Sequence, residues 1–282
     1  MTNEVVATTL PGAPLLLLGG TDPVGRFILD RTSRRRAVTV IGRSKPHRDD
    51  VAWHRADLAL GAVAFPEGRA QQAIATLPIW LLDAHLPALT RMGADRLIAF
   101  SSTSVEAKRE SRSAKARAVV AALSGGEAAV MEAAHKAGIR TTILRPALIY
   151  GAGEDANVSA AARFIERFGF FPLAWNAQGL RQPVHADDLA AAALAALESP
   201  AAVGMTYALP GGETLAYRAM IARIFETLGR PPRFVRIPGL AAISDLASRM
   251  ARDQAFDAGP AARDLGYAPR RFLSGGRSDL GL

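Results

Sequence analysis

The stretch Leu18-Gly19-Gly20-Thr21-Asp22-Pro23-Val24-Gly25 directly follows an apolar run at residues 15–17 and precedes apolar residues spaced three and four apart. A strand, a glycine-rich turn and an amphipathic helix, in this order, are typical of the first unit of a dinucleotide-binding α/β domain. Gly19 is expected to form the tight turn. Gly25 is expected to let the helix pack closely on the strand.

Two residues of this turn depart from the usual pattern. Asp22 stands where a missing side chain normally lets the backbone approach a phosphate, and Pro23 has no N–H to donate. Aspartate is a good N-cap, and proline is favoured as the first residue of a helix. The pair therefore predicts a firm helix start, obtained at the expense of phosphate contacts.

Short apolar, β-branched segments alternate with helical patterns in the first half of the chain. Strands are expected at 15–18, 37–41, 74–77, 96–100 and 140–144, and helices at 24–31, 78–91 and 127–137. Further along, the pattern predicts a strand before a helix capped by Asp187 or Asp188, a strand at 204–212, a helix at 214–229 and a strand at 233–239. Alternating strands and helices predict an α/β fold, a Rossmann-type doubly wound parallel sheet with a small C-terminal substrate lobe.

The domain boundaries follow from the same pattern. Residues 13–150, continued by 186–209, are expected to form the dinucleotide-binding core. Residues 151–185 and 210–282 are expected to form the smaller substrate-side lobe, because the strand–helix alternation ends after Tyr150.

Composition excludes several classes of protein. The 282 residues include no cysteine, which excludes disulfides and thiolate chemistry, and no apolar run reaches the roughly 18 residues of a membrane span. The first residues carry Glu4 and no early Lys or Arg, unlike a signal peptide, so a cytoplasmic location is expected. The net charge is +8, but only four of the 34 basic residues are lysines and no aromatics interleave with the basic clusters, which disfavours nucleic-acid binding.

The end of the second expected strand bears on cofactor choice. Proteins that prefer NAD place an acid there for the ribose 2′-hydroxyl, whereas this chain has Arg43, Ser44 and Lys45. These residues would suit a 2′-phosphate, so NADP(H) is favoured over NAD(H). A basic surface turn without a ligand is the alternative.

Several segments together resemble the extended short-chain dehydrogenase/reductases, the NAD-dependent epimerase/dehydratase group. They are "GGTDPVG", "ADL" at 56–58, "RLIAFSSTSV" at 96–105, "ILRPALIYG" at 143–151 and "RQPVHADDLA" at 181–190. The resemblance covers nearly the whole chain. It implies a role for Asp57 at the adenine end, and it places Leu77 and Pro78 along the cofactor. For Asp57, helix capping is the alternative.

The resemblance also implies the remaining site residues. Ser102 or Thr103 falls at the family's catalytic hydroxyl, and Arg181 matches an arginine that holds a substrate diphosphate, with Asn157 beside the substrate. The expected cofactor-binding residues are Gly19, Thr21, Asp22, Val24, Gly25, Arg43, Ser44, Asp57, Leu77 and Pro78.

The family's catalytic Tyr-x-x-x-Lys pair has no counterpart at its expected place. When Glu127 is aligned with the family's helix glutamate, the two positions hold Val119 and Leu123, and no tyrosine is followed by lysine four residues later. Tyr150, at a strand end, is the candidate general acid that remains, with packing as its alternative role.

Two functions follow from these residues. The first is an NADP(H)-dependent oxidoreductase or epimerase-like enzyme acting on a small polar substrate such as a nucleotide-sugar. The alternative is a non-catalytic protein that senses NADP(H) or joins an assembly, of the NmrA-like type. No metal site is expected, and the sequence leaves a homo-oligomer open.

Overall fold

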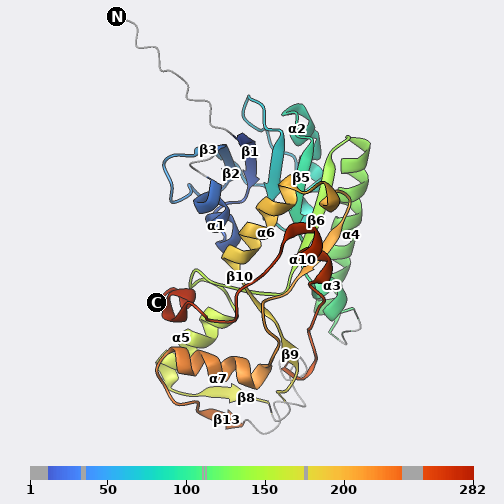
Figure 1. The fold of residues 1–282 in the computed structure, drawn as a ribbon. Coiled ribbons are helices and arrows are strands. Elements are labelled where there is room, and N and C mark those ends of the chain that lie inside the picture. Colours follow the sequence, from blue (N-terminus) through green and yellow to red (C-terminus); the bar gives the residue numbers. More distant parts are fainter. Residues whose placement is uncertain (1–11, 33–35, 110, 112, 175–176, 237–249) are drawn as a thin grey trace, which may run out of the picture.

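The computed structural model describes residues 12–32, 36–109, 111, 113–174, 177–236 and 250–282. A seven-stranded sheet forms its centre, with the strand order β11-β6-β5-β4-β1-β2-β3 and every neighbouring pair parallel. The strands are β1 (Gly12–Leu18), β2 (Arg36–Gly42), β3 (Ala52–Arg55), β4 (Gln72–Ala75), β5 (Arg96–Phe100), β6 (Arg140–Pro146) and β11 (Thr206–Leu209). Helices cover both faces (Figure 1), so the predicted doubly wound α/β fold is confirmed.

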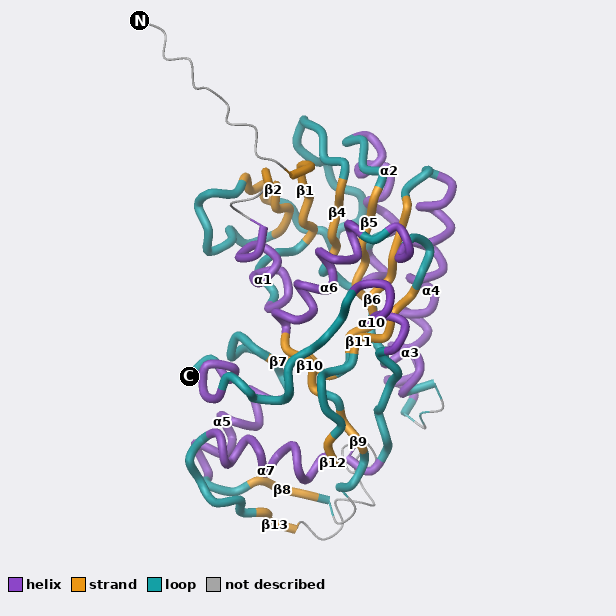
Figure 2. Tube along the Cα trace, viewed as in Figure 1, coloured by secondary structure: helices purple, strands orange, loops and turns teal. Residues whose placement is uncertain are grey.

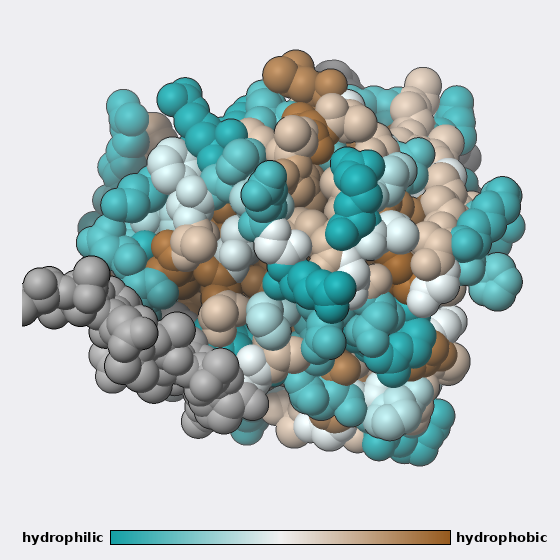
Figure 3. Space-filling view, turned by 90° about the horizontal axis from the view of Figure 1, so that it is seen from above, coloured by the Kyte–Doolittle hydropathy of each residue, from teal (hydrophilic) through white to brown (hydrophobic). Residues whose placement is uncertain are grey.

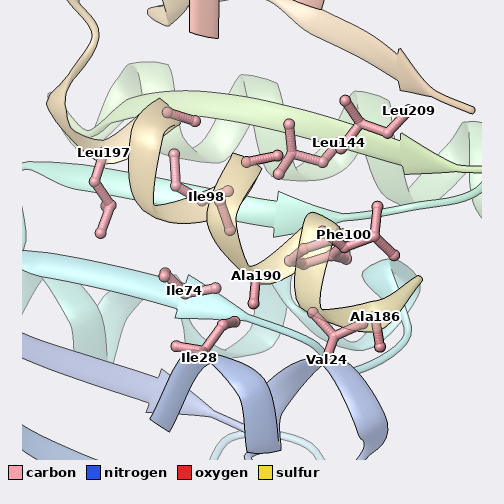
Figure 4. Close-up of a cluster of buried hydrophobic side chains, with 14 of the residues drawn as sticks. Val24, Ile28, Ile74, Ile98, Phe100, Leu144, Ala186, Ala190, Leu197 and Leu209 are labelled. Carbon is pink, nitrogen blue, oxygen red and sulfur yellow. The ribbon is translucent and has the colours of Figure 1, made fainter. Parts of the chain in front are cut away.

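The apolar run in β1 is continuous because both faces of the sheet are buried. Leu15 and Leu17 belong to the cluster beneath α1 (Pro23–Thr32) and α6 (Ala186–Glu198), which Figure 4 shows. Leu16 and Leu18 belong to the opposite cluster, beneath α2 (Leu86–Arg91) and α4 (Ala114–Lys136). All four leucines are at most 1% exposed, and burying each side chain contributes about 1.5–3 kcal/mol.

A smaller lobe lies at one end of the sheet (Figures 1 and 2) and has its own apolar core. In the described part of the chain, three two-stranded ladders and two helices build it: β7 (Leu148–Tyr150) with β10 (Pro183–His185), β9 (Leu180–Arg181) with β12 (Leu215–Ala216), β8 (Phe171–Leu173) with β13 (Phe234–Arg236), α5 (Val158–Phe168) and α7 (Tyr217–Thr227). The chain then returns to the sheet through α10 (Gly259–Leu265) and ends in the short 3-10 helix η4 (Gly276–Leu280). Of the strand expected at 233–239, residues 237–239 lie outside the described part.

The surface opposite the lobe is mixed. Seen from above, polar side chains alternate with small apolar patches (Figure 3). In the described part of the chain, no helix has the length and apolar character needed to cross a membrane.

Most expected elements are present, but several details differ. The segment 78–91 is not one helix: it divides into the 3-10 helices η1 (Ile79–Leu81) and η2 (Asp83–His85) and the helix α2, and Pro87 stands at the start of α2. Strand β4 ends at Ala75, two residues before the expected end. Strand β3 was not predicted, since its four residues bury little and carry no alternation. A further difference concerns α4.

Helix α4 begins at Ala114 rather than near 127, because Gly125 and Gly126 do not interrupt it. A β-carbon on Gly126 would lie 2.7 Å from the backbone nitrogen of Trp80. The glycine therefore allows α4 to pack directly on η1, which outweighs its weak helix propensity.

The predicted cap of α6 is wrong. His185 caps this helix, with its Nδ1 accepting a hydrogen bond from the Asp187 backbone N–H at 3.1 Å. Asp187 and Asp188 lie in the first turn and pair with Arg270 at 2.5 and 3.0 Å, and Asp187 also pairs with Arg31. These ion pairs join the first helix, α6 and the returning C-terminal segment.

Arg96 connects three elements from within the core. It is 2% exposed, and its guanidinium donates to the carbonyls of Arg140 and Ala196 and to the hydroxyl of Thr142. Burial lowers the pKa of Arg96 to about 10, so the group stays charged at neutral pH.

We expect Arg96→Ala to lower the free energy of unfolding by about 3 kcal/mol, because the substitution leaves buried carbonyls without a donor. Chemical denaturation measures this change. The exposed Arg140→Ala, whose side chain pairs with Asp95 at the surface, is the matched control and should cost less than about 1 kcal/mol. Equal losses for the two variants would contradict the assigned role of Arg96.

Candidate functional site

Three neighbouring cavities lie where the parallel strands end at their carboxyl edge, the place where open α/β sheets bind ligands. We call them the outer, middle and lobe cavities, with volumes of about 390, 250 and 370 Å³. The outer and middle cavities share Asp22, Thr76, Leu77 and Pro78, and the middle and lobe cavities share Ile149. The three cavities therefore follow one another from the glycine turn to the lobe.

The glycine turn requires its glycines. Gly19 has a φ of +120°, and a β-carbon there would lie 2.1 Å from the Thr76 hydroxyl oxygen. A β-carbon on Gly25 would lie 2.5 Å from the Gly20 α-carbon. Gly19 forms the turn as expected, and Gly25 brings α1 close to Gly20 of the turn, whereas the sequence predicted a close approach to the strand.

Asp22 caps α1, as its sequence position indicates. Its Oδ1 accepts from the backbone N–H groups of Val24 and Gly25, each at 3.1 Å, and Pro23 begins the helix. Its Oδ2 accepts from the Thr76 hydroxyl at 2.5 Å. The carboxylate thus uses the backbone donors of Val24 and Gly25 in the first turn of α1.

The outer cavity has polar residues on the side away from the turn. Arg43 and Ser44, just beyond β2, line it together with Thr21 and Asp57. Asp57 also accepts from the Ala59 backbone N–H at 3.0 Å, so the side chain caps its own turn while facing the cavity. Arg43 is exposed, and in the described part of the chain no ion pair involves it, whereas Lys45 pairs with Asp49 at 2.7 Å.

The middle cavity is largely apolar. Leu77, Pro78, Trp80, Leu123 and Ile149 line it, with Ser101 as a polar group. Val119, one turn before Leu123 on α4, is 37% exposed. Among the described residues that line this cavity there is neither a tyrosine nor a lysine.

A charged network supports the wall of the middle cavity. Glu127 on α4 accepts from Ser101 at 2.5 Å and from Arg145 on β6, which also pairs with Glu106 at 2.8 Å. The hydrogen bonds with Glu127 raise the pKa of Arg145 above its ordinary value. The network links the end of β5, β6 and α4. The hydrogen bond with Glu127 fixes the orientation of the Ser101 side chain.

The lobe cavity contains the residues expected to meet a substrate. Ser102, Thr103, Asn157 and Arg181 all line it. The Thr103 hydroxyl donates to the Pro146 carbonyl at 3.1 Å, and the Ser102 hydroxyl accepts from Ser104 N–H. Sequence reasoning therefore selected four residues that the fold brings to one cavity.

Arg181 is held mainly by backbone. It is 3% exposed, and its Nη1 donates to the carbonyls of Leu180 and Arg252 at 2.6 and 2.7 Å. The guanidinium lies 5.4 Å from the Tyr217 ring, and burial lowers the pKa of Arg181. This arrangement keeps a positive charge at the cavity wall.

Tyr150 is a core residue, which favours packing, the alternative to its expected role as a general acid. The side chain is fully buried against His185 and Phe272, and its hydroxyl accepts from the Leu273 backbone N–H at 3.2 Å. Burial raises the pKa of Tyr150. The phenol faces none of the three cavities.

Two residues of the site escaped the sequence interpretation. Thr76 binds Asp22 across 54 positions of the chain, which no local pattern reveals. Asp155, rather than Asn157, caps α5 by accepting from the N–H groups of Val158 and Ser159. The available signal was an acidic residue shortly before the helix, since aspartate is a favoured capping residue. No cluster of three or more potential metal ligands occurs in the described part.

The seven-stranded parallel sheet, with helices on both faces and cavities at its carboxyl edge, is a Rossmann-type α/β fold. Residues 83–209 match the model of the NAD dependent epimerase/dehydratase family. The chain is epimerase/dehydratase-like, in sequence over this region and in fold over almost its entire length.

The solved structures that resemble it share the fold at low sequence identity. A UDP-glucuronic acid 4-epimerase from Bacillus cereus, in complex with NAD, matches with a TM-score of 0.72 and 16% identity, covering 94% of this chain and 96% of that one. An epimerase from Methanothermobacter thermautotrophicus matches with a TM-score of 0.76 and 13% identity, covering 96% and 91%.

Curated relatives match over shorter regions. The mitochondrial NADH dehydrogenase [ubiquinone] 1 alpha subcomplex subunit 9 of Arabidopsis thaliana is 33% identical over 113 residues, 40% of this chain and 28% of that protein. An uncharacterized Sinorhizobium fredii protein is 29% identical over 160 residues, 51% of this chain and 40% of that one. The matched regions thus span well under half of these relatives.

We expect Tyr150→Phe to lower the free energy of unfolding by about 1 kcal/mol, since the buried Leu273 N–H loses its acceptor. Binding of nucleotides should stay unchanged. Thermal unfolding and calorimetric titration of the same preparation measure the two effects. A variant that unfolds like the parent but loses a ligand or an activity would restore the acid role to Tyr150.

Proposed function

We propose that this protein binds NADP(H) through the 2′-phosphoadenosine end of the cofactor and lacks the family's Tyr/Lys proton transfer. On this proposal it reports the cofactor to a partner or an assembly. The observation that carries the proposal is the outer cavity, where Arg43 and Ser44 stand beside the glycine turn.

The outer cavity fits an adenosine group. Its volume is about 390 Å³, and Leu58, Leu77 and Leu81 give it apolar surface for a base. Arg43 offers a planar, charged fork that suits a phosphate, and Ser44 and Asp57 offer partners for ribose oxygens. An arginine here that forms no ion pair within the described part of the chain supports NADP(H) over NAD(H).

The glycine turn fits the cofactor less well. Pro23 has no N–H, and the N–H groups of Val24 and Gly25 already donate to Asp22. The adenosine end therefore supplies most of the binding in this proposal.

The middle cavity supports a role without catalysis. Alignment on Glu127 puts Val119 and Leu123 where the family has tyrosine and lysine, and neither side chain can transfer a proton. Glu127 itself is kept in its network with Ser101 and Arg145. The helix thus retains its structural anchor without the reactive pair.

The relatives agree with an assembly role. Two of the curated matches are named as subunits of NADH dehydrogenase, and one is the Arabidopsis protein described above. An assembly partner for this chain is accordingly part of the proposal. A cytoplasmic location stays an expectation from composition.

The lobe cavity favours a second candidate, an enzyme acting on a small anionic substrate. Arg181 gives this cavity a buried positive charge, and Ser102 and Thr103 give it hydroxyl groups.

If the protein is such an enzyme, Ser102→Ala should reduce turnover of a nucleotide-sugar at least tenfold while leaving NADPH binding intact. A product assay with UDP-sugars and NADP⁺, which accepts a hydride from the sugar, distinguishes the candidates, since a sensor yields no product with either the parent or the variant.

We expect Arg43→Ala to weaken NADPH binding by about 10- to 100-fold, as loss of charged hydrogen bonds to a phosphate predicts. NADH binding should change less than threefold, because NADH carries no 2′-phosphate. Isothermal titration calorimetry measures both. Lys45→Ala removes the same charge two residues away, from a side chain already paired with Asp49, and should bind like the parent. Equal weakening by the two variants would point to net charge alone and reject a 2′-phosphate site at Arg43.

A further inference from the structure

The carboxylate of Asp22 lies inside the glycine turn. Its Oδ2 would be 3.3 Å from a β-carbon on Gly19 and 3.0 Å from one on Gly25. It accepts three hydrogen bonds, from Val24 N–H, Gly25 N–H and the Thr76 hydroxyl. A phosphate at a helix N-terminus is held by the same kind of donors. The side chain therefore occupies the position of an anion.

The neighbouring residue gives no substitute donor. Pro23 lacks an N–H, so residues 23–25 present no unused backbone donor to a ligand. The hydroxyl of Thr76 is also committed, at 2.5 Å from Asp22. A ligand phosphate arriving at this turn would have to displace the carboxylate to gain any of these bonds.

The place of Asp22 in the groove makes its charge important. Asp22 lines both the outer and the middle cavity, so a ligand extending from one into the other passes it. The 5′-phosphates of a dinucleotide form the link between its two halves and would lie against this carboxylate. The negative charges of the phosphates and of the carboxylate would repel each other, most strongly where water is partly excluded.

We propose that Asp22 replaces the phosphate of the ligand in the glycine turn, so that binding strength comes from the 2′-phosphoadenosine end and each 5′-phosphate weakens it. This inference rests on the proposed function and deepens it: Asp22 is a specificity-determining residue. It makes the site a weak, readily reversible binder of dinucleotides, as a sensor of cofactor concentration requires.

Three ligands together measure how much the 5′-phosphate groups contribute to the binding affinity. Adenosine 2′-monophosphate carries only the 2′-phosphate, 2′,5′-ADP adds one 5′-phosphate, and NADP⁺ adds the rest of the dinucleotide. Calorimetric titration of the parent should give 2′,5′-ADP and NADP⁺ affinities no higher than that of adenosine 2′-monophosphate.

Variants of Asp22 should reverse this order. Asp22→Gly empties the turn and releases two N–H donors, so 2′,5′-ADP should bind at least tenfold more tightly than adenosine 2′-monophosphate. Asp22→Asn keeps a good cap and removes only the charge, so it should give an intermediate ratio and guards against a folding defect in the glycine variant. Asp30→Asn, on the exposed side of α1, removes the same charge elsewhere and should behave like the parent.

The outcomes separate the two proposals. If adenosine 2′-monophosphate binds the parent but the 5′-phosphate preference is the same in the parent and in both Asp22 variants, the role of Asp22 is rejected and the proposed function stands. If neither the parent nor any variant binds any of the three ligands, the proposed function fails and the inference fails with it. A reversal in Asp22→Gly that Asp30→Asn lacks supports both.

Discussion

The first crossover of this fold depends on the close contact between the glycine turn and the start of α1. The backbones of Gly20 and Gly25 approach so closely that a single added carbon would overlap them, and Asp22 holds the helix end in place. This contact sets where α1 lies on the sheet, and α1 in turn packs along α6. The same contact decides what the edge of the sheet can offer a ligand. A carboxylate that satisfies the helix also removes the donors that make such a turn an anion site.

The elements that the sequence predicted well are those set by local chemistry. Residues 96–100 form β5 with unchanged bounds, and Asp22 with Pro23 starts α1 as expected. The elements that it missed depend on contacts distant in the chain. From the sequence alone, Gly126 predicts a break in the helix. In the structure it is required because the backbone of Trp80 lies against it. Asp187 was predicted as a helix cap, but in the structure it forms ion pairs with Arg270 and Arg31.

The candidate site divides in the same way. Motif positions brought Ser102, Thr103, Asn157 and Arg181 to one cavity, because the family pattern records which strand ends meet at the edge. For Tyr150 the sequence left catalysis and packing open; its side chain lies in the lobe core, where Phe272 from the returning C-terminal segment packs against it. The sequence around Tyr150 gives no indication that the C-terminal segment packs against it. Burial of this kind is a property of the assembled lobe and is not encoded in any local stretch.

Because side chains of the protein complete the hydrogen bonds of the glycine turn, ligand binding affects the stability of α1 less than in an open turn. In a glycine turn with open N–H groups, a bound phosphate completes the hydrogen bonds of the helix start, so ligand binding adds to the order of α1. Here Asp22 and Thr76 complete those bonds within the chain, and α1 needs no ligand for its first turn. A nucleotide in the outer cavity would therefore act on Arg43 and the loop beyond β2 rather than on the core. Because that loop is exposed, a change there is accessible to a partner protein, which an enzyme's buried reaction centre is not.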